Sequence, residues 1–133
     1  MLNTFPQLLT YGFFAPTVLR VLVAFSFFYI AYAQSSHRKE IAELKIKIIG
    51  HVDQTMVLIS SLVIAATGLA LFFGWHTQIA AILGILVCLK HAIYAKKYPR
   101  LIPLCRLEYI YLIVILLTLL ISGAGALAMD VPL

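Results

Sequence analysis

Four long apolar runs, separated by short polar segments, dominate the pattern of the chain. A helix needs about 20 residues to cross the hydrocarbon core of a bilayer, and only segments that satisfy their own backbone hydrogen bonds are tolerated there. The pattern therefore predicts an all-α fold, a four-transmembrane-helix antiparallel bundle in which residues 1–133 form a single membrane domain. The predicted helices cover about residues 8–33, 52–74, 77–95 and 107–129.

The polar connections carry a strongly uneven charge. Lys and Arg fall in the connections 34–51 and 96–106, and they are missing before Tyr11, from the tight turn at residues 73–76 and from the C-terminal tail. Basic residues collect in cytoplasmic loops, so both connections are expected to be cytoplasmic and both termini to lie on the outer side. The basic residues of the two connections are Arg38, Lys39, Lys45, Lys47, Lys96, Lys97, Arg100 and Arg106.

Composition excludes several classes of protein. Hydrophobic residues make up 63% of the 133 residues and charged residues 11%, against about 45–50% and about 25% in an ordinary soluble domain. An ordinary cytosolic enzyme, a disordered chain and a disulfide-framed secreted domain are therefore not expected. The net charge of +5 is explained by the cytoplasmic loops, so nucleic acid is not an expected partner. The predicted location is the plasma membrane, as a multi-pass protein of a prokaryotic inner membrane.

Small and polar residues repeat at helical spacing along three of the predicted helices. In the third helix the opposite side is lined by large aliphatic residues such as Ile79 and Leu86. Helix association in lipid uses small residues and polar contacts, so the small sides are predicted packing faces. These faces are Thr77, Ala81, Gly84, Cys88, His91 and Ala95 in the third helix, Ser61, Ala65 and Gly68 in the second, and Glu108, Tyr111, Ile115, Thr118, Ser122 and Gly125 in the fourth.

Arg20 is the most unusual residue of the first predicted helix, which also contains Pro16. It lies about 18 Å along that helix, and an arginine cannot be neutralised by losing its proton. Charges inside a membrane are costly and are functional candidates. One hypothesis is that Arg20 anchors an anion or a polar headgroup inside the bundle. The other is that it is a structural buried charge, tied to carbonyls of the fourth helix and to Asp130.

A second group of ionisable residues lies near the cytoplasmic ends of the helices. Asp53, His91, Glu108 and Tyr111 form a predicted polar intramembrane cluster. A histidine has a suitable pKa for proton exchange, and a carboxylate orients it or receives the proton, so a His91–carboxylate pair would suit a quinone or partner site. The alternative is a charge network that holds the helix ends together. The spacing of His and Cys predicts no metal site, and no catalytic residue is assigned.

Three stretches of the chain carry a family resemblance. Residues 19–25 (LRVLVAF) contain an arginine motif in the first helix. Residues 68–74 (GLALFFG), followed by 76–81 (HTQIAA), combine a glycine-rich second helix with a tight turn. Glu108 opens the fourth helix, and residues 122–130 (SGAGALAMD) close it. In this order and spacing the stretches resemble the DoxX-like family of small integral membrane proteins, and the resemblance implies a four-helix membrane bundle.

Some members of that family are associated with quinone-linked sulfur oxidation or with membrane redox complexes. The resemblance therefore implies a small membrane subunit of a redox complex, without catalytic activity of its own, and with a quinone as the candidate cofactor. The expected partner from the apolar runs is the lipid bilayer, and subunits of a redox complex and a second copy of the chain are further candidate partners. Two other functions stay open: a structural, assembly or lipid-binding membrane partner, and a small transporter, which would be expected to show inverted repeats or broken helices.

Overall fold

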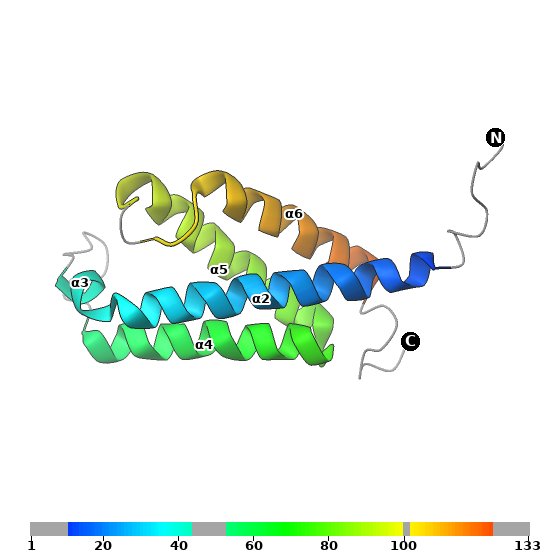
Figure 1. Ribbon diagram of the computed structural model, residues 1–133, viewed down its shortest axis with the longest axis horizontal. Helices are drawn as coiled ribbons and strands as arrows, with labels where there is room; N and C mark the ends of the chain where they lie inside the picture. The colour runs from blue at the N-terminus through cyan, green and yellow to red at the C-terminus, as the bar shows by residue number, and fades with distance from the viewer. Residues whose placement is uncertain (1–10, 44–52, 100–101, 124–133) are drawn as a thin grey trace.

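The described part of the chain consists of helices joined by short turns and loops. The computed structural model describes residues 11–43, 53–99 and 102–123 (Figure 1). No strand occurs in these ranges, so the all-helical prediction is confirmed for them. The elements are the 3-10 turn η1 (Gly12–Phe14) and the helices α2 (Ala15–Ser36), α3 (Arg38–Glu43), α4 (Gln54–Phe73), α5 (Thr77–Lys97) and α6 (Arg106–Ser122).

The first long helix begins and ends later than predicted. Instead of covering residues 8–33, α2 starts at Ala15 behind η1 and continues to Ser36. Pro16 lies in the first turn of α2, where the missing N–H of a proline costs no intrahelical hydrogen bond and its fixed φ suits the helix. Pro16 therefore starts the helix and does not interrupt it. Residues 8–10 lie outside the described part of the chain.

The turn between α4 and α5 is as tight as the sequence predicts. Gly74 and His76 both adopt the left-handed conformation, with φ angles of 67° and 48°. The Gly74 N–H donates to the Leu71 carbonyl at 3.2 Å, and the Trp75 N–H donates to the Ala70 carbonyl at 2.9 Å. These bonds satisfy the last carbonyls of α4, as in other glycine-terminated helices. The turn sends α5 back along α4.

The last helix is shorter than the predicted range of 107–129. It comprises the 17 residues Arg106–Ser122 and is followed by Gly123, whose φ is 78°. Residues 124–133 lie outside the described part. Three helices, α2, α4 and the Thr77–Lys96 portion of α5, are long and apolar enough to cross a membrane. At about 1.5 Å per residue, α6 rises about 26 Å, close to the about 30 Å of a hydrocarbon core.

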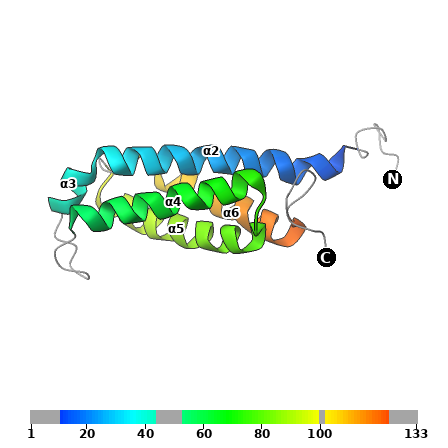
Figure 2. The same cartoon turned by 90° about the horizontal axis from the view of Figure 1, so that it is seen from below.

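The four long helices alternate in direction (Figures 1 and 2). The most extensive contacts are between α2 and α4 and between α5 and α6, so the bundle consists of two helical hairpins joined by the α4–α5 turn. We call the end where α2 meets α3 and where α6 begins the basic end, because Arg38, Lys39, Lys96 and Arg106 lie there. The opposite end, which holds the α4–α5 turn, is the turn end.

The packing face predicted for α5 is confirmed. Its six residues are all buried, whereas Ile79 and Leu86 on the opposite side are 57% exposed. A Cβ on Gly84 would lie 3.1 Å from both the Phe27 ring and Leu116, so this glycine is needed for close approach of α2 and α6. The small face of α5 therefore accommodates the large side chains of its neighbours.

The packing face predicted for α6 is wrong. Glu108, Tyr111, Thr118 and Ser122 are exposed, and Ile115 is half-buried. The Thr118 hydroxyl donates to the Val114 carbonyl of its own helix at 2.8 Å, so it needs no partner on another helix. Large side chains fill the space above the small face of α5 and make many van der Waals contacts there, whereas a small hydroxyl side chain makes few. The buried face of α6 consists of Tyr109, Leu112, Leu116 and Leu119.

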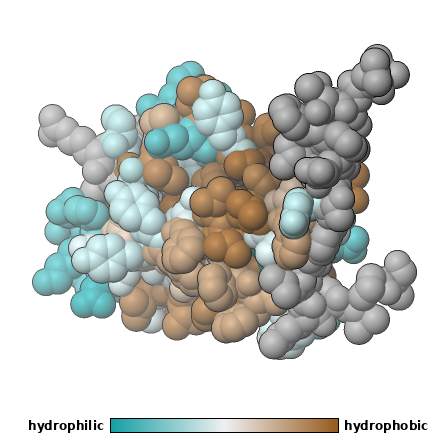
Figure 3. All heavy atoms as spheres, turned by 45° about the vertical axis from the view of Figure 1, so that its right-hand side comes forward, coloured by the Kyte–Doolittle hydropathy of each residue, from teal (hydrophilic) through white to brown (hydrophobic). Residues whose placement is uncertain are grey.

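Large apolar side chains cover the outside of the bundle. Every long helix carries several that are exposed, up to 87% for Ile121 on α6. Figure 3 shows one face of the molecule, where brown apolar side chains cover most of the middle and polar ones gather at the left and the top. A contiguous apolar surface of this extent marks contact with a membrane or a protein, and here it agrees with the three helices long enough to cross a bilayer.

Candidate functional site

A buried polar cluster lies in the half of the bundle nearer the basic end. We call its four residues, Gln34, Ser61, His91 and Tyr109, the His91 cluster. They come from α2, α4, α5 and α6 in that order, and each is at most 8% exposed. The cluster therefore joins all four long helices at one level of the bundle.

His91 is held by both ring nitrogens. Nδ1 lies 2.8 Å from the Val87 carbonyl of its own helix, and Nε2 lies 3.2 Å from Oε1 of Gln34 on α2. The carbonyl of Val87 accepts a hydrogen bond, so Nδ1 carries the proton of that pair. A glutamine amide contains both a donor and an acceptor. In the structure Oε1 faces His91 and the amide nitrogen faces Val57, so Gln34 accepts from a protonated Nε2 and would have to turn its amide to donate to an unprotonated one.

Tyr109 stacks on His91 inside the bundle. The two ring centroids are 5.5 Å apart and the ring planes differ by 27°, within the range of favourable stacked aromatic pairs. The Tyr109 side chain is fully buried. Its hydroxyl lies near the backbone of Leu104, in the segment that leads into α6. Tyr109 therefore acts in the cluster mainly through its ring, which fixes the orientation of the imidazole.

Two further hydrogen bonds join α2 to α4. Gln34 Nε2 donates to the Val57 carbonyl at 3.3 Å, and Ser61 Oγ donates to the Ala31 carbonyl at 2.8 Å. Hydrogen bonds between helices contribute about 0.6 kcal/mol each in a membrane, and up to about 1.7 kcal/mol. The His91 cluster therefore contributes to the association of the helices, in addition to placing an imidazole inside the bundle.

The carboxylates predicted beside His91 lie elsewhere. Glu108 accepts a hydrogen bond from the Cys105 N–H at 2.6 Å, because an acidic residue in the first turn satisfies the free N–H groups of α6 and their positive dipole end. Asp53 is exposed and precedes α4, and Tyr111 is 59% exposed. Within the described ranges, no ion pair joins His91 to either carboxylate. The predicted cluster of Asp53, His91, Glu108 and Tyr111 is therefore not brought together.

Arg20 is buried, as the sequence predicts. It is 2% exposed, and Thr67 on α4 and Thr77 on α5 are also buried in the half nearer the turn end. The Thr67 hydroxyl donates to the Val63 carbonyl of its own helix at 2.9 Å. Asp130, the predicted acidic partner, lies outside the described residues. Ser122, at the end of α6, is exposed.

Sequence reasoning missed Gln34 and Tyr109. Gln34 was assigned to the first polar connection, although it continues the helical spacing of Phe27 and Ile30, which are both fully buried. Extending that spacing by one turn would have placed the amide inside the bundle. Tyr109 belongs to the leucine face of α6, which was not recognised as the packing face.

The described residues contain no group of three His, Cys, Asp or Glu side chains arranged to hold a metal ion. Comparisons of the chain with protein-family models, curated proteins and solved structures give no match. The DoxX-like resemblance therefore stays an expectation drawn from the sequence. The structure itself shows an all-helical protein with three helices able to span a membrane and a histidine-centred polar cluster between them.

Proposed function

We propose that the chain is an integral membrane protein that crosses the bilayer four times. The apolar outer surface and the three long helices support this, and α6 runs antiparallel to α5 over a comparable height. The basic end lies in the cytoplasm and the turn end outside, because Lys and Arg favour the cytoplasmic side. The membrane is the plasma membrane of a prokaryotic cell.

Within that membrane, the proposed function is that of a small non-catalytic subunit bound to a larger complex. The observation that carries it is the outward face of α6, on which Tyr111, Thr118 and Ser122 are exposed and Ile115, half-buried against the core, forms the inner edge. These residues follow the alternating spacing of four and three that forms a seam between paired helices. Small and hydroxyl-bearing residues favour close approach of helices in lipid. Because the seam faces away from the bundle, its partner helix belongs to another chain.

On the basis of the DoxX-like resemblance, we propose that this partner is a membrane redox complex. The His91 cluster supports a structural role for the interior, since its hydrogen bonds are made between helices of this chain. In this proposal the chain supplies a rigid four-helix body, and the outward face of α6 makes the contact.

A photo-reactive amino acid introduced at residue 118 tests the contact in living cells. The expected product is an adduct with a larger membrane protein. The matched control places the same group at Leu62, which is 68% exposed on α4 and should give lipid adducts. An adduct between two copies of the chain would show that the partner on this face is a second copy of the chain and not a larger complex. Lipid adducts alone at residue 118 would contradict the proposal.

Quinone binding at His91 is a second candidate, favoured by the stack of His91 on Tyr109. A hydroxyl group of the reduced quinone would take the place of the Gln34 amide and donate to Nε2, because the His91 ring carries its proton on Nδ1, and the flat quinone ring would lie beside Tyr109. Gln34 then competes with the quinone, so Gln34→Ala is expected to raise the quinone content of the purified protein. His91→Ala should remove it. Equal quinone content in both variants would contradict this candidate.

A further inference from the structure

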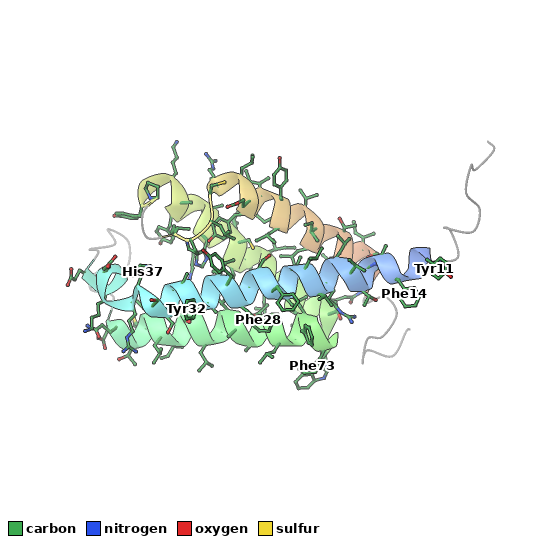
Figure 4. The ribbon with its side chains drawn as sticks, in the orientation of Figure 1. Tyr11, Phe14, Phe28, Tyr32, His37 and Phe73 are labelled. Atoms are coloured by element: carbon green, nitrogen blue, oxygen red, sulfur yellow. The ribbon has the colours of Figure 1, made fainter. Side chains whose placement is uncertain are left out.

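A hollow lies at the basic end, where α2 passes into α3. It has a volume of about 550 Å³ and is lined by Tyr32, Ser36, His37, Arg38, Lys39 and Glu40, together with Ser35. Figure 4 labels Tyr32 and His37 near this junction. The hollow is of the size of small-molecule sites, which start near 300 Å³. It belongs neither to the His91 cluster nor to the outward face of α6.

The lining of the hollow suits a phosphate group. Arg38 and Lys39 supply two cationic donors, and Ser35 and Ser36 supply hydroxyl donors. The carboxylate of Glu40 also lines the hollow, but it faces Nδ1 of His37 at 3.6 Å. A guanidinium and an ammonium beside hydroxyl groups are typical phosphate ligands.

An apolar track leads away from the hollow along the outside of α2. Tyr32 is 74% exposed, and Tyr29, Phe25 and Leu22 are each more than half exposed. They recur at spacings of three and four, so they form one stripe on the helix surface. From Tyr32 to Leu22 the stripe covers about 15 Å, half the about 30 Å of a hydrocarbon core. A single leaflet of lipid has this length.

We propose that the α2–α3 hollow binds the phosphate headgroup of an anionic phospholipid whose acyl chains lie along the α2 track. The polar lining selects the headgroup, and the track distinguishes a lipid from a free phosphate ion. The inference rests on the proposed membrane placement and is independent of the partner complex.

Native mass spectrometry of the full chain, released from detergent, tests the proposal. The probes are phosphatidylglycerol and phosphatidylcholine with identical acyl chains. The site variant is Arg38→Gln/Lys39→Gln. The control variant, Lys96→Gln/Arg106→Gln, removes the same number of charges from the same end, outside the hollow. Each cation near an anionic headgroup contributes about fivefold in affinity, so the site variant should bind phosphatidylglycerol about twentyfold more weakly. The control should change less than twofold.

Three results would overturn the proposal. Equal losses in the two variants would assign the effect to the overall charge of the basic end. Equal binding of the two lipids by the unaltered chain would show that the hollow does not select an anionic headgroup. Displacement of phosphatidylglycerol by an equal concentration of inorganic phosphate would make the ligand a free anion. All the substituted residues are exposed, and unchanged circular dichroism would show that each variant still folds. The crosslinking result at residue 118 is unaffected by any of these outcomes.

Discussion

The two halves of the bundle are held together in different ways. Near the basic end, side chains form hydrogen bonds from one helix to another, as Gln34 does with His91 and Ser61 with Ala31. Toward the turn end, the Thr67 hydroxyl bonds within its own helix, and Phe27 packs against Gly68 and Gly84. Interhelical hydrogen bonds are thus prominent in the first half, and the second shows close packing of a large ring against two glycines.

The difference matters because lipid changes the value of each type of contact. Apolar side chains gain little by leaving lipid for a protein interior, so close packing and interhelical hydrogen bonds decide which helices associate. Close packing stabilises any arrangement in which the helix backbones approach closely, whereas a hydrogen bond stabilises only the arrangement that brings its two atoms together. The hydrogen bonds near the basic end therefore help to specify the register of α2 against α4 and α5, and the contacts of Phe27 with the two glycines add close packing.

Removing Phe27 should break the packed half and have the largest effect. Phe27→Ala deletes a fully buried ring and leaves a cavity between four helices, with an expected loss of about 3 kcal/mol of unfolding free energy. Unfolding in mixed micelles measures it. Leu22→Ala is the control, since Leu22 is 58% exposed and should change the stability by less than about 0.5 kcal/mol. Similar losses in both variants would show that Phe27 is not a packing centre.

His91→Phe tests the hydrogen-bonded half. The variant keeps a ring beside Tyr109 but removes the partner of Gln34, leaving a buried amide oxygen unsatisfied, so we expect a loss of about 2 kcal/mol. Adding Gln34→Leu removes the unsatisfied group as well and should restore part of the stability. The same micelle unfolding experiment measures both. Additive losses in the double variant would contradict the hydrogen bond between Gln34 and His91.

Two serines allow a comparison between a hydroxyl that bonds to another helix and one that bonds within its own helix. Ser61→Ala removes a bond between helices and should cost about 1 kcal/mol. Ser26→Ala removes a bond of 3.1 Å to the Leu22 carbonyl of the same helix, and it should change the unfolding free energy by less than about 0.5 kcal/mol. If the two variants are equally stable, interhelical hydrogen bonds do not distinguish the basic-end half.

Tyr109→Phe should have the smallest effect. The ring stays stacked on His91, and the deleted hydroxyl loses only a contact with the backbone of Leu104 whose geometry is poor. A poorly aligned hydrogen bond contributes little, so the variant should differ from the unaltered protein by less than about 1 kcal/mol of unfolding free energy. A loss of more than about 1 kcal/mol would reveal a hydrogen bond to the Tyr109 hydroxyl.

Sequence patterns predict the helices and the face of α5 well, because small and large residues separate cleanly there. They fail for α6, where a hydroxyl-bearing face and a leucine-rich face both have the spacing of a packing face. The sequence does not show that Thr118 satisfies its hydroxyl within its own helix, which leaves the leucines to pack. The prediction of a carboxylate beside His91 is wrong for a related reason, because Glu108 accepts a hydrogen bond from the Cys105 N–H at the start of its own helix. Local hydrogen bonds thus decide which polar residues are left for the interior.

The tight α4–α5 turn also bears on how the protein enters a membrane. In the proposed orientation this turn is the segment that must cross the bilayer between α4 and α5. It consists of Gly74, Trp75 and His76, and it carries neither Lys nor Arg. Translocating it therefore requires the dehydration of a few backbone groups and one imidazole. The two helices can enter the bilayer together as a preformed hairpin, so that membrane insertion and the first step of folding become a single event.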